Sequence, residues 1–188
     1  TYLGYAAFPV ATGYTNAMGL GYNARPDGSN RIHVGNTSIT SIKGQVGFTT
    51  YSDARFKTPP REDVHALDLI MKLRPVTYNV DAHALAAQMK EDVRYDSTGA
   101  PVLQTDPLDV QARDEQSRIR YTGFIAQEVE AASRSLGYDF SGVDRPASDE
   151  GLYGLRYAEF VVPLVKAVQE QQAIIEQLKE RIEELEKR

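Results

Sequence analysis

The sequence predicts an α+β fold built from three consecutive regions of different composition. Residues 1–51 hold eight of the 14 glycines, and single apolar residues alternate there with small polar ones. Residues 52–160 mix helical and strand-like apolar spacing, whereas residues 161–188 contain no glycine and repeat apolar residues in heptads. We therefore expect a short-stranded β segment, a mixed α/β domain and a long C-terminal coiled-coil helix.

Within the first region, short apolar runs broken by turn residues predict strands at residues 18–22, 32–34 and 39–42. An apolar–x–apolar unit followed by glycine or asparagine recurs there about every 14 residues. A segment this short has little core of its own. Repeats of this kind need stacking, either along the chain or between chains, and we expect association with other copies of the chain to stabilise the segment.

In the second region, apolar residues at helical spacing predict a helix over 64–73, which Pro75 ends. Residues 76–80 are typical of a strand, and Asp81 is a suitable N-cap for a helix over 82–90. Residues 91–118 are polar and contain glycine and proline, so we expect a long loop. The last elements expected are a strand, a helix that Gly137 ends and a strand, over residues 119–121, 124–136 and 152–157.

The third region has the spacing of a coiled coil. Its apolar positions alternate at intervals of three and four residues from Val161 to Leu185, with Gln171 as the single polar exception. Pro163 is expected to start the helix or to kink it near its N-terminus. The alternative is a single amphipathic helix that packs on its own domain. The charged tail of the helix argues against it, because the heptad stripe is the one apolar face that the tail could bury.

The composition excludes several classes of function. The chain has no cysteine, which rules out disulfides, thiol nucleophiles and cysteine-ligated metals. Its net charge of −5 argues against nucleic-acid binding through phosphate contacts. No apolar run approaches the roughly 20 residues that a membrane span needs. The three histidines are scattered, so we expect neither a metal nor a cofactor. Since Thr1 begins no signal peptide, we expect the chain to be part of a longer protein.

One short segment is a candidate for catalysis, the run from Tyr51 to Lys57. A serine hydroxyl beside a lysine amine can serve as a nucleophile with its general base. A lysine acts as a base only when burial or a neighbouring cation lowers its pKa well below the ordinary ~10.4. Ser52 and Lys57 are five residues apart and share no face of a regular helix or strand. A bend or a neighbouring chain must therefore bring them together, and an ordinary polar turn is the alternative.

Four motifs, in this order along the chain, resemble the intramolecular chaperone auto-processing domain of phage tailspikes, endosialidases and tail fibres. The motifs are Ser52-Asp-x-Arg55-x-Lys57, Leu73-Arg-Pro75-Val-Thr-Tyr78, Tyr121-Thr-Gly123-Phe-Ile-Ala-Gln127-Glu128-Val and Leu155-Arg-Tyr157-x-Glu159 with Leu164-Val-Lys-Ala167-Val-Gln169 after it. Residues 138–143 and 151–169 look most like bacterial tail-fibre-domain proteins of the Bacteroidetes type. Residues 13–47 are more loosely similar to the head and neck repeats of trimeric adhesins.

The resemblance implies a homotrimer with three parts: the β-rich end of a fibre or adhesin stalk (1–51), the chaperone domain (52–160) and the coiled coil (161–188). The chaperone domain would hold three upstream chains in register while they fold, and then cut the Tyr51–Ser52 bond. In this reading Ser52 is the nucleophile and Lys57 the general base. The charge boundary coincides with the cut, because net charge is +2 before Ser52 and −7 from Ser52 onward.

The resemblance also suggests supporting residues, partners and a location. Asp53 and Arg55 are expected to fix the turn, and Gln127 and Glu128 to orient the dyad. The expected partners are other copies of the chain and the upstream fibre or adhesin, without nucleic acid. The expected location is a virion tail fibre or the bacterial cell surface.

Two other functions remain open at this point. The first is a trimerisation cap with the same fold that never cleaves and stays attached to its fibre. The second is an adhesin tip in which residues 1–47 bind a glycan or receptor through exposed aromatic side chains. The aromatic candidates are Tyr2, Tyr5, Phe8 and Tyr14.

Overall fold

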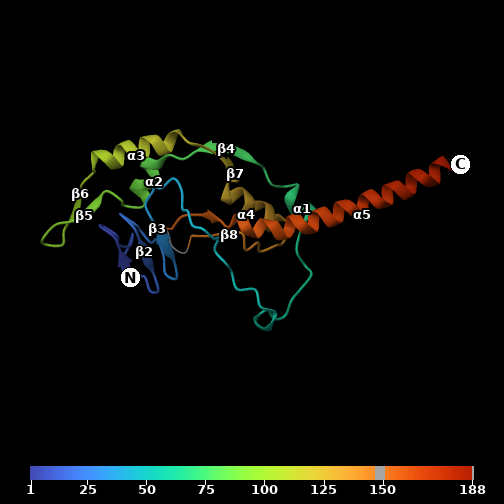
Figure 1. Cartoon of the computed structure of the whole chain (residues 1–188), viewed down its shortest axis with the longest axis horizontal. Helices are drawn as coiled ribbons and strands as arrows, with labels where there is room; N and C mark the ends of the chain where they lie inside the picture. Colours follow the sequence, from blue (N-terminus) through green and yellow to red (C-terminus); the bar gives the residue numbers. More distant parts are fainter. Residues whose placement is uncertain (147–150, 188) are drawn as a thin grey trace. The chain divides into compact units, whose positions relative to one another are not determined.

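The computed structural model describes residues 1–146 and 151–187 (Figure 1). Contacts divide the chain into two compact units, both assembled from segments distant in sequence. The first unit comprises Thr1–Gln45, Val76–Gly123 and Arg145–Leu152, and the second Val46–Pro75, Phe124–Asp144 and Tyr153–Arg188. The predicted mixture of helices and strands is confirmed: the described residues form five α-helices, which include a long C-terminal one, and several short strands. The functional boundary predicted at Tyr51–Ser52 stays a prediction.

The first unit begins with a parallel ladder of three short strands, drawn in blue in Figure 1. The strands are β1 (Tyr2–Leu3), β2 (Met18–Leu20) and β3 (Ile32–Val34), paired in that order. Met18 lies opposite Ile32 and Leu20 opposite Val34, so the repeat of about 14 residues corresponds to one rung of the ladder. The prediction of a strand at residues 39–42 is wrong: β3 ends at Val34, and Gly35, with a φ of 77°, turns the chain out of the ladder.

Equivalent asparagines stack at the turns of the ladder. Asn16 and Asn30 both have positive φ, at 51° and 59°, a conformation that asparagine adopts more readily than most residues. Asn16 Nδ2 donates a 2.9 Å hydrogen bond to Asn30 Oδ1. One residue before each asparagine, Thr15 N donates to Ser29 Oγ at 3.0 Å. The polar residues of the repeat therefore join successive turns.

The rest of the first unit is built around β4 and β7. β4 (Val76–Asn79) pairs antiparallel with β7 (Arg120–Gly123), which places Tyr78 opposite Tyr121. α2 (Ala82–Gln88) starts where predicted, because the Asp81 side chain accepts a 2.9 Å hydrogen bond from Ala84 N.

The long loop expected over residues 91–118 is wrong. These residues form the hairpin of β5 (Val93–Tyr95) and β6 (Pro101–Leu103), followed by the 12-residue α3 (Pro107–Arg118). The buried face of α3 is polar, since its buried residues are Asp109, Arg113 and Gln116. They recur at helical spacing, but a search for apolar periodicity misses a helix whose buried side chains carry charge.

The second unit contains the remaining helices and one small sheet. α1 (Leu67–Ile70) is shorter than predicted, because Met71 and Lys72 already form a turn ahead of Pro75. α4 (Ala126–Ser135) ends before Gly137, whose φ of 67° confirms its predicted role. β8 (Val143–Asp144) pairs antiparallel with β9 (Gly154–Leu155).

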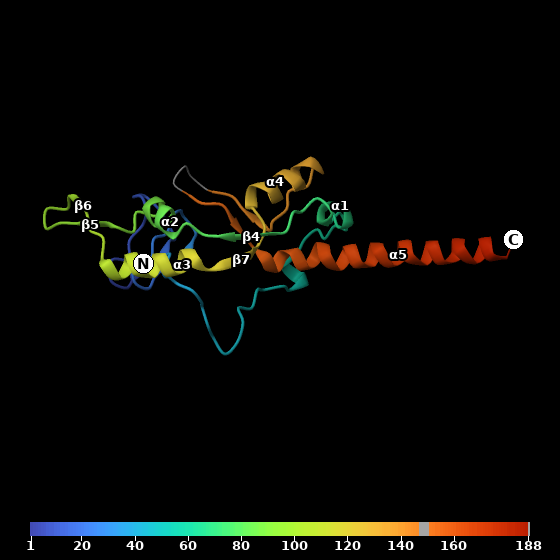
Figure 2. The same ribbon diagram turned by 90° about the horizontal axis from the view of Figure 1, so that it is seen from above.

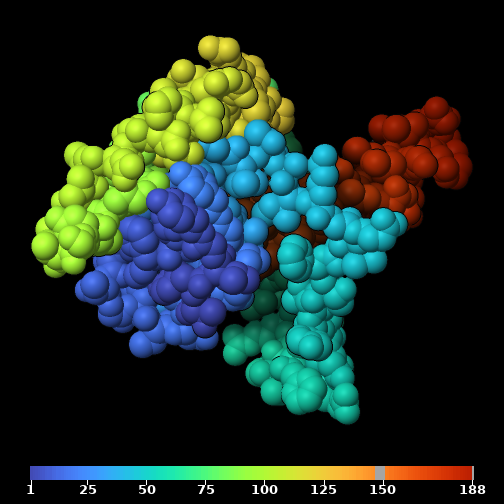
Figure 3. Space-filling model, turned by 60° about the vertical axis from the view of Figure 1, so that its left-hand side comes forward, coloured from blue at the N-terminus to red at the C-terminus, as the bar shows by residue number. Residues whose placement is uncertain are grey.

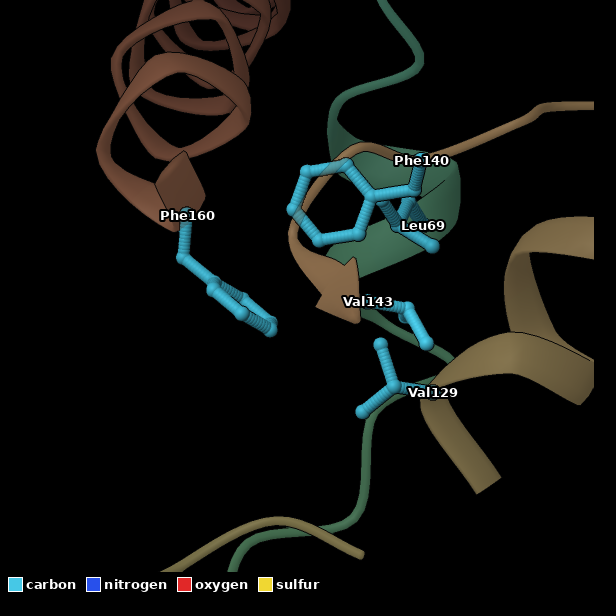
Figure 4. Close-up of a cluster of buried hydrophobic side chains, with 5 residues drawn as sticks. All are labelled: Leu69, Val129, Phe140, Val143 and Phe160. Atoms are coloured by element: carbon cyan, nitrogen blue, oxygen red, sulfur yellow. The ribbon is translucent and has the colours of Figure 1, made fainter. Parts of the chain in front are cut away.

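A compact apolar cluster fixes these elements to one another. Figure 4 shows its five buried side chains turned toward a common centre: Leu69, Val129, Phe140, Val143 and Phe160. Phe140 and Phe160 meet edge to face with ring centroids 4.9 Å apart, a favourable geometry for aromatic pairs. The cluster therefore joins α1, α4 and the β8 strand to the start of the long helix.

α5 (Val161–Glu186) is one continuous 26-residue helix, as predicted (Figure 2). A 3-10 turn at Tyr157–Phe160 leads into it, and Pro163 is tolerated because it lies in the first turn. α1 packs against α5, where Leu67 N donates a 3.1 Å hydrogen bond to Glu170 Oε2. Among the described residues, no helix is long and apolar enough to cross a membrane.

Candidate functional site

The candidate catalytic residues lie in an exposed segment of the second unit. Every residue from 46 to 63 is exposed, and Tyr51 is fully so. Figure 3 shows this segment, in cyan to teal, with open space around most of its side chains. The peptide bond between Tyr51 and Ser52 is therefore free of packing within its own chain.

A short 3-10 turn shapes the segment just after that bond. The turn covers Ala54–Phe56, and Asp53 caps it by accepting a 2.9 Å hydrogen bond from Arg55 N. The Arg55 guanidinium also donates to the Asp53 carboxylate, at 2.6 Å for the closest pair. The hydrogen bonds from Arg55 lower the pKa of Asp53, and the same pairing raises the pKa of Arg55. Asp53 and Arg55 are thus joined to each other across the bend.

The bend brings the two predicted dyad residues together. Lys57 Nζ donates a 2.7 Å hydrogen bond to Ser52 Oγ. The chain reverses at the turn, since Lys57 N donates to Ala54 O at 3.2 Å. The geometry therefore supplies the contact between hydroxyl and amine that five residues of regular helix or strand would not provide.

Gln127 and Glu128 lie elsewhere in the second unit, on the first turn of α4. Glu128 accepts hydrogen bonds from the Arg74 guanidinium, one of them 3.0 Å long from Nε. This pairing lowers the pKa of Glu128 and raises the pKa of Arg74. In the part of the chain that the structure describes, neither Gln127 nor Glu128 bonds to Ser52 or Lys57. Their proposed orienting role stays a prediction.

Three of the four motifs meet around the start of α4. The Arg74–Glu128 ion pair joins the second motif to the third. Phe124 N donates a 3.0 Å hydrogen bond to Tyr157 Oη, which joins the third motif to the fourth. Sequence reasoning gave Arg74 no role, and its only signal was its place inside the second motif. These contacts indicate that the motifs after the first build the scaffold of the second unit.

Two of the four aromatic side chains considered for glycan binding, Tyr5 and Phe8, have partners within the first unit. Tyr5 stacks on Tyr22 with ring centroids 5.9 Å apart, and Phe8 lies beneath the Arg25 guanidinium at 3.3 Å. The Tyr14 hydroxyl is buried.

The histidines are paired singly with carboxylates. His33, His65 and His83 lie 3.1, 2.6 and 2.7 Å from one carboxylate oxygen of Asp27, Asp68 and Asp114. Within the described ranges, no three histidines or acidic residues gather as metal ligands would.

The comparison with known families bears on the same part of the chain as the serine–lysine pair. Residues 52–138 match the family model described as the chaperone of endosialidase, Peptidase_S74. This match confirms the resemblance predicted from the motifs. The match begins at Ser52 and contains the first three motifs. A search of curated proteins finds no match to the chain.

The family assigns a chaperone role to this part of the chain, and its name indicates peptidases of the self-cleaving serine kind. Its setting is the tail fibre and the endosialidase, which indicates association with a virion or a surface.

Proposed function

We propose that the chain trimerises, holds its upstream β segment in register and then cuts its own Tyr51–Ser52 bond. The observation that carries the proposal is the 2.7 Å hydrogen bond from Lys57 to Ser52, located at the first residue of the family match. The proposal has three parts, which are trimerisation, registration and cleavage.

Support for trimerisation comes from the apolar stripe of α5. Its heptad residues remain about half exposed in the single chain, with exposed fractions from 45% at Ile175 to 63% at Val168. Burying apolar surface stabilises association by roughly 25 cal/mol per Å². Val162 and Val165 also line a groove with Val64 beside the start of the helix. Other copies of α5 would cover the stripe and form the predicted coiled coil.

Support for registration comes from the open edges of the β ladder. β1 and β3 each have one paired and one unpaired side in the three-stranded sheet. Unpaired strand edges invite wrong pairing between chains. A coiled coil would raise the local concentration of three such segments and align them in the same register. The chaperone would thereby favour correct pairing over aggregation.

The cleavage step uses only groups of the segment itself. Ser52 Oγ attacks the carbonyl carbon of Tyr51 while neutral Lys57 Nζ accepts the hydroxyl proton. The C–N bond then breaks, and Nζ returns the proton to the leaving nitrogen, which leaves an ester between Tyr51 and Ser52. Water hydrolyses this ester to a Tyr51 carboxylate and restores the Ser52 hydroxyl beside a free amino group. Proximity favours this intramolecular attack, and a reaction that occurs once needs no substrate pocket.

Assembly would activate the dyad. In the single chain the segment is exposed, together with the large side chains of Phe48, Tyr51 and Phe56. A neighbouring chain that covered these apolar groups would also exclude water from the amine, and burial favours the neutral form of a lysine. Cleavage would therefore follow trimerisation and would not precede it.

A non-cleaving assembly cap is the second candidate, and the exposure of the pair favours it. No structure within the described residues encloses the Ser52 hydroxyl, which has Lys57 as its one hydrogen-bond partner there. In this function the coiled coil and the ladder would act as proposed, and the Tyr51–Ser52 bond would stay intact.

Expression of the wild type beside Ser52→Ala tests the two functions. We expect the wild type to give two fragments on a denaturing gel, with masses that place the cut between Tyr51 and Ser52. Ser52→Ala should remain full length, and light scattering should give a trimer for it. A wild-type trimer that stays full length would leave the non-cleaving cap as the function.

A further inference from the structure

The first unit contains a cluster of buried polar side chains that takes no part in the proposed cleavage. Glu91 follows α2 and is 2% exposed. Its carboxylate accepts two hydrogen bonds of 2.8 Å, from Thr37 N to Oε1 and from Thr37 Oγ1 to Oε2. Arg113 of α3, also 2% exposed, approaches the carboxylate at 3.4 Å. A buried charge is tolerated only with such partners, so these contacts are specific.

Arg25 and Asn23 extend the cluster from the turn that follows β2. Arg25 is 1% exposed and donates through Nη2 to Val93 O at 2.9 Å and through Nε to Asn23 Oδ1 at 2.9 Å. Asn23 Nδ2 in turn donates to Glu91 O at 2.8 Å. Burial raises the pKa of Glu91 and lowers the pKa of Arg25 to about 10, which shows how far both groups are withdrawn from water.

These bonds connect residues on opposite sides of Tyr51–Ser52. Asn23, Arg25 and Thr37 precede the bond, whereas Glu91 and Arg113 follow it. Further bonds at the edge of the cluster cross in the same way: Tyr22 to Asp109 at 2.9 Å, Lys90 to Val10 at 3.2 Å, Arg31 to Arg145 at 3.0 Å and Leu152 to Asp27 at 3.1 Å. The segment that contains the bond is exposed throughout and contributes nothing to this packing.

We propose that the cluster of Asn23, Arg25, Thr37, Glu91 and Arg113, here termed the polar latch, holds the upstream segment after the chain is cut. The inference rests on the proposed function for the position of the cut, and it makes release a second step. Residues 76–123 would be the docking surface and residues 1–45 the occupant. Recognition would come from the Thr37 amide and hydroxyl on the Glu91 carboxylate and from Arg25 on backbone carbonyls.

The latch accounts for a delay between cleavage and release. Cleavage in an exposed segment breaks no buried contact, so both fragments keep the bonds described above. Three latches in one trimer would have to open together, which slows separation further. Separation of the fragments also takes partners away from the buried charged groups of the latch. A partly buried charge that has lost its partner costs free energy.

The test cuts the chain without using its own chemistry. A recognition sequence for a site-specific protease is placed between Thr49 and Thr50 in the full-length Ser52→Ala variant, and the trimer is cut and passed over a sizing column in native buffer. We expect the two fragments to co-elute and to separate only under denaturing conditions. Immediate separation of the fragments on the column would overturn the proposal. Because the added protease makes the cut, the result does not depend on whether Ser52 and Lys57 are active.

Two variants assign the retention to the latch. Thr37→Val removes the hydroxyl with little change of shape, and Glu91→Gln removes the charge. We expect each to speed dissociation of the cut chains at least tenfold, whereas Asp114→Asn, on an exposed residue paired with His83, should leave it unchanged. Circular dichroism of the uncut variants checks folding. If Glu91→Gln fails to fold, the dissociation rate of the cut Thr37→Val chains tests the assignment. Unchanged dissociation in every folded latch variant would overturn the assignment.

Discussion

Lys57 Nζ and Ser52 Oγ are 2.7 Å apart in a segment where every side chain is exposed. The contact depends on the one bend that Asp53 and Arg55 close between them. The pair is therefore positioned by local chemistry alone and does not need the core of either unit. Burial of the pair is what assembly would add.

Replacing Lys57, or Asp53 in the turn that positions it, should slow cleavage. Lys57→Met keeps the length of the side chain but removes the amine, and we expect it to slow cleavage by about 10²–10⁴-fold. Asp53→Ala removes the cap of the turn and the ion pair with Arg55, and should slow cleavage several-fold. A time course on denaturing gels measures both rates. Met71→Ala, at an exposed residue away from the segment, is the control and should cleave at the wild-type rate.

The first unit should lose stability in acid through Asp27. Burial alone would raise the pKa of Asp27, but hydrogen bonds from His33, Arg31 and Leu152 N outweigh burial and hold it well below its ordinary 3.8. A carboxylate with a depressed pKa stabilises the fold above its unfolded value and loses that contribution as pH falls. The difference in unfolding free energy between Ser52→Ala and Ser52→Ala/Asp27→Asn should therefore be largest near pH 6 and shrink below about pH 4. A constant difference across this range would contradict the role of Asp27.

Gly4 should tolerate no side chain. Its φ is 142°, and a Cβ at this position would lie 2.2 Å from Gly21 O. Gly4→Ala should therefore destabilise the ladder by about 2–4 kcal/mol through strain and collision with backbone. Gly13→Ala is the matched control, since Gly13 also has positive φ but a Cβ there would meet no atom within 4 Å beyond its chain neighbours. Denaturant unfolding of both variants should give a clearly smaller loss for Gly13→Ala.

The apolar cluster of the second unit should respond to truncation. Leu69 is fully buried against Val129 and Phe140, so Leu69→Ala should cost about 2–5 kcal/mol of unfolding free energy. Met71→Ala, two residues further along, should cost little because Met71 is exposed. Thermal unfolding followed by circular dichroism would detect the difference. Equal losses would show that the cluster does not anchor α1.

The apolar stripe of α5 should determine the oligomeric state. Leu178→Lys places a charge at a heptad position, and we expect it to weaken the trimer so that light scattering at micromolar concentration detects monomer. Lys179→Ala lies outside the stripe and should remain trimeric. If both the wild type and Lys179→Ala were monomers, that result would contradict trimerisation through α5.

How far the sequence predicted the fold depended on the kind of signal. Asp81 marked the start of α2 and Gly137 the end of α4, because capping and left-handed turns depend on single residues. The 14-residue repeat indicated units that stack, and the structure shows that they stack along the chain as rungs of one ladder. α3 escaped prediction because Asp109, Arg113 and Gln116 form its buried face, and only their partners in the folded unit make burial of such groups tolerable.

For the candidate site, the sequence by itself predicted the pair, Ser52 and Lys57, that the structure brings into contact. The spacing from Ser52 to Lys57, with Asp53 and Arg55 between them, defines a motif whose bend closes through neighbours in the chain. Only the tertiary structure decided that residues 1–45 pack with residues 76–123, across the predicted cut. The reason is physical: a local turn depends on side chains a few residues apart, whereas the bond between Thr37 and Glu91 joins residues 54 positions apart and exists only once the chain has folded.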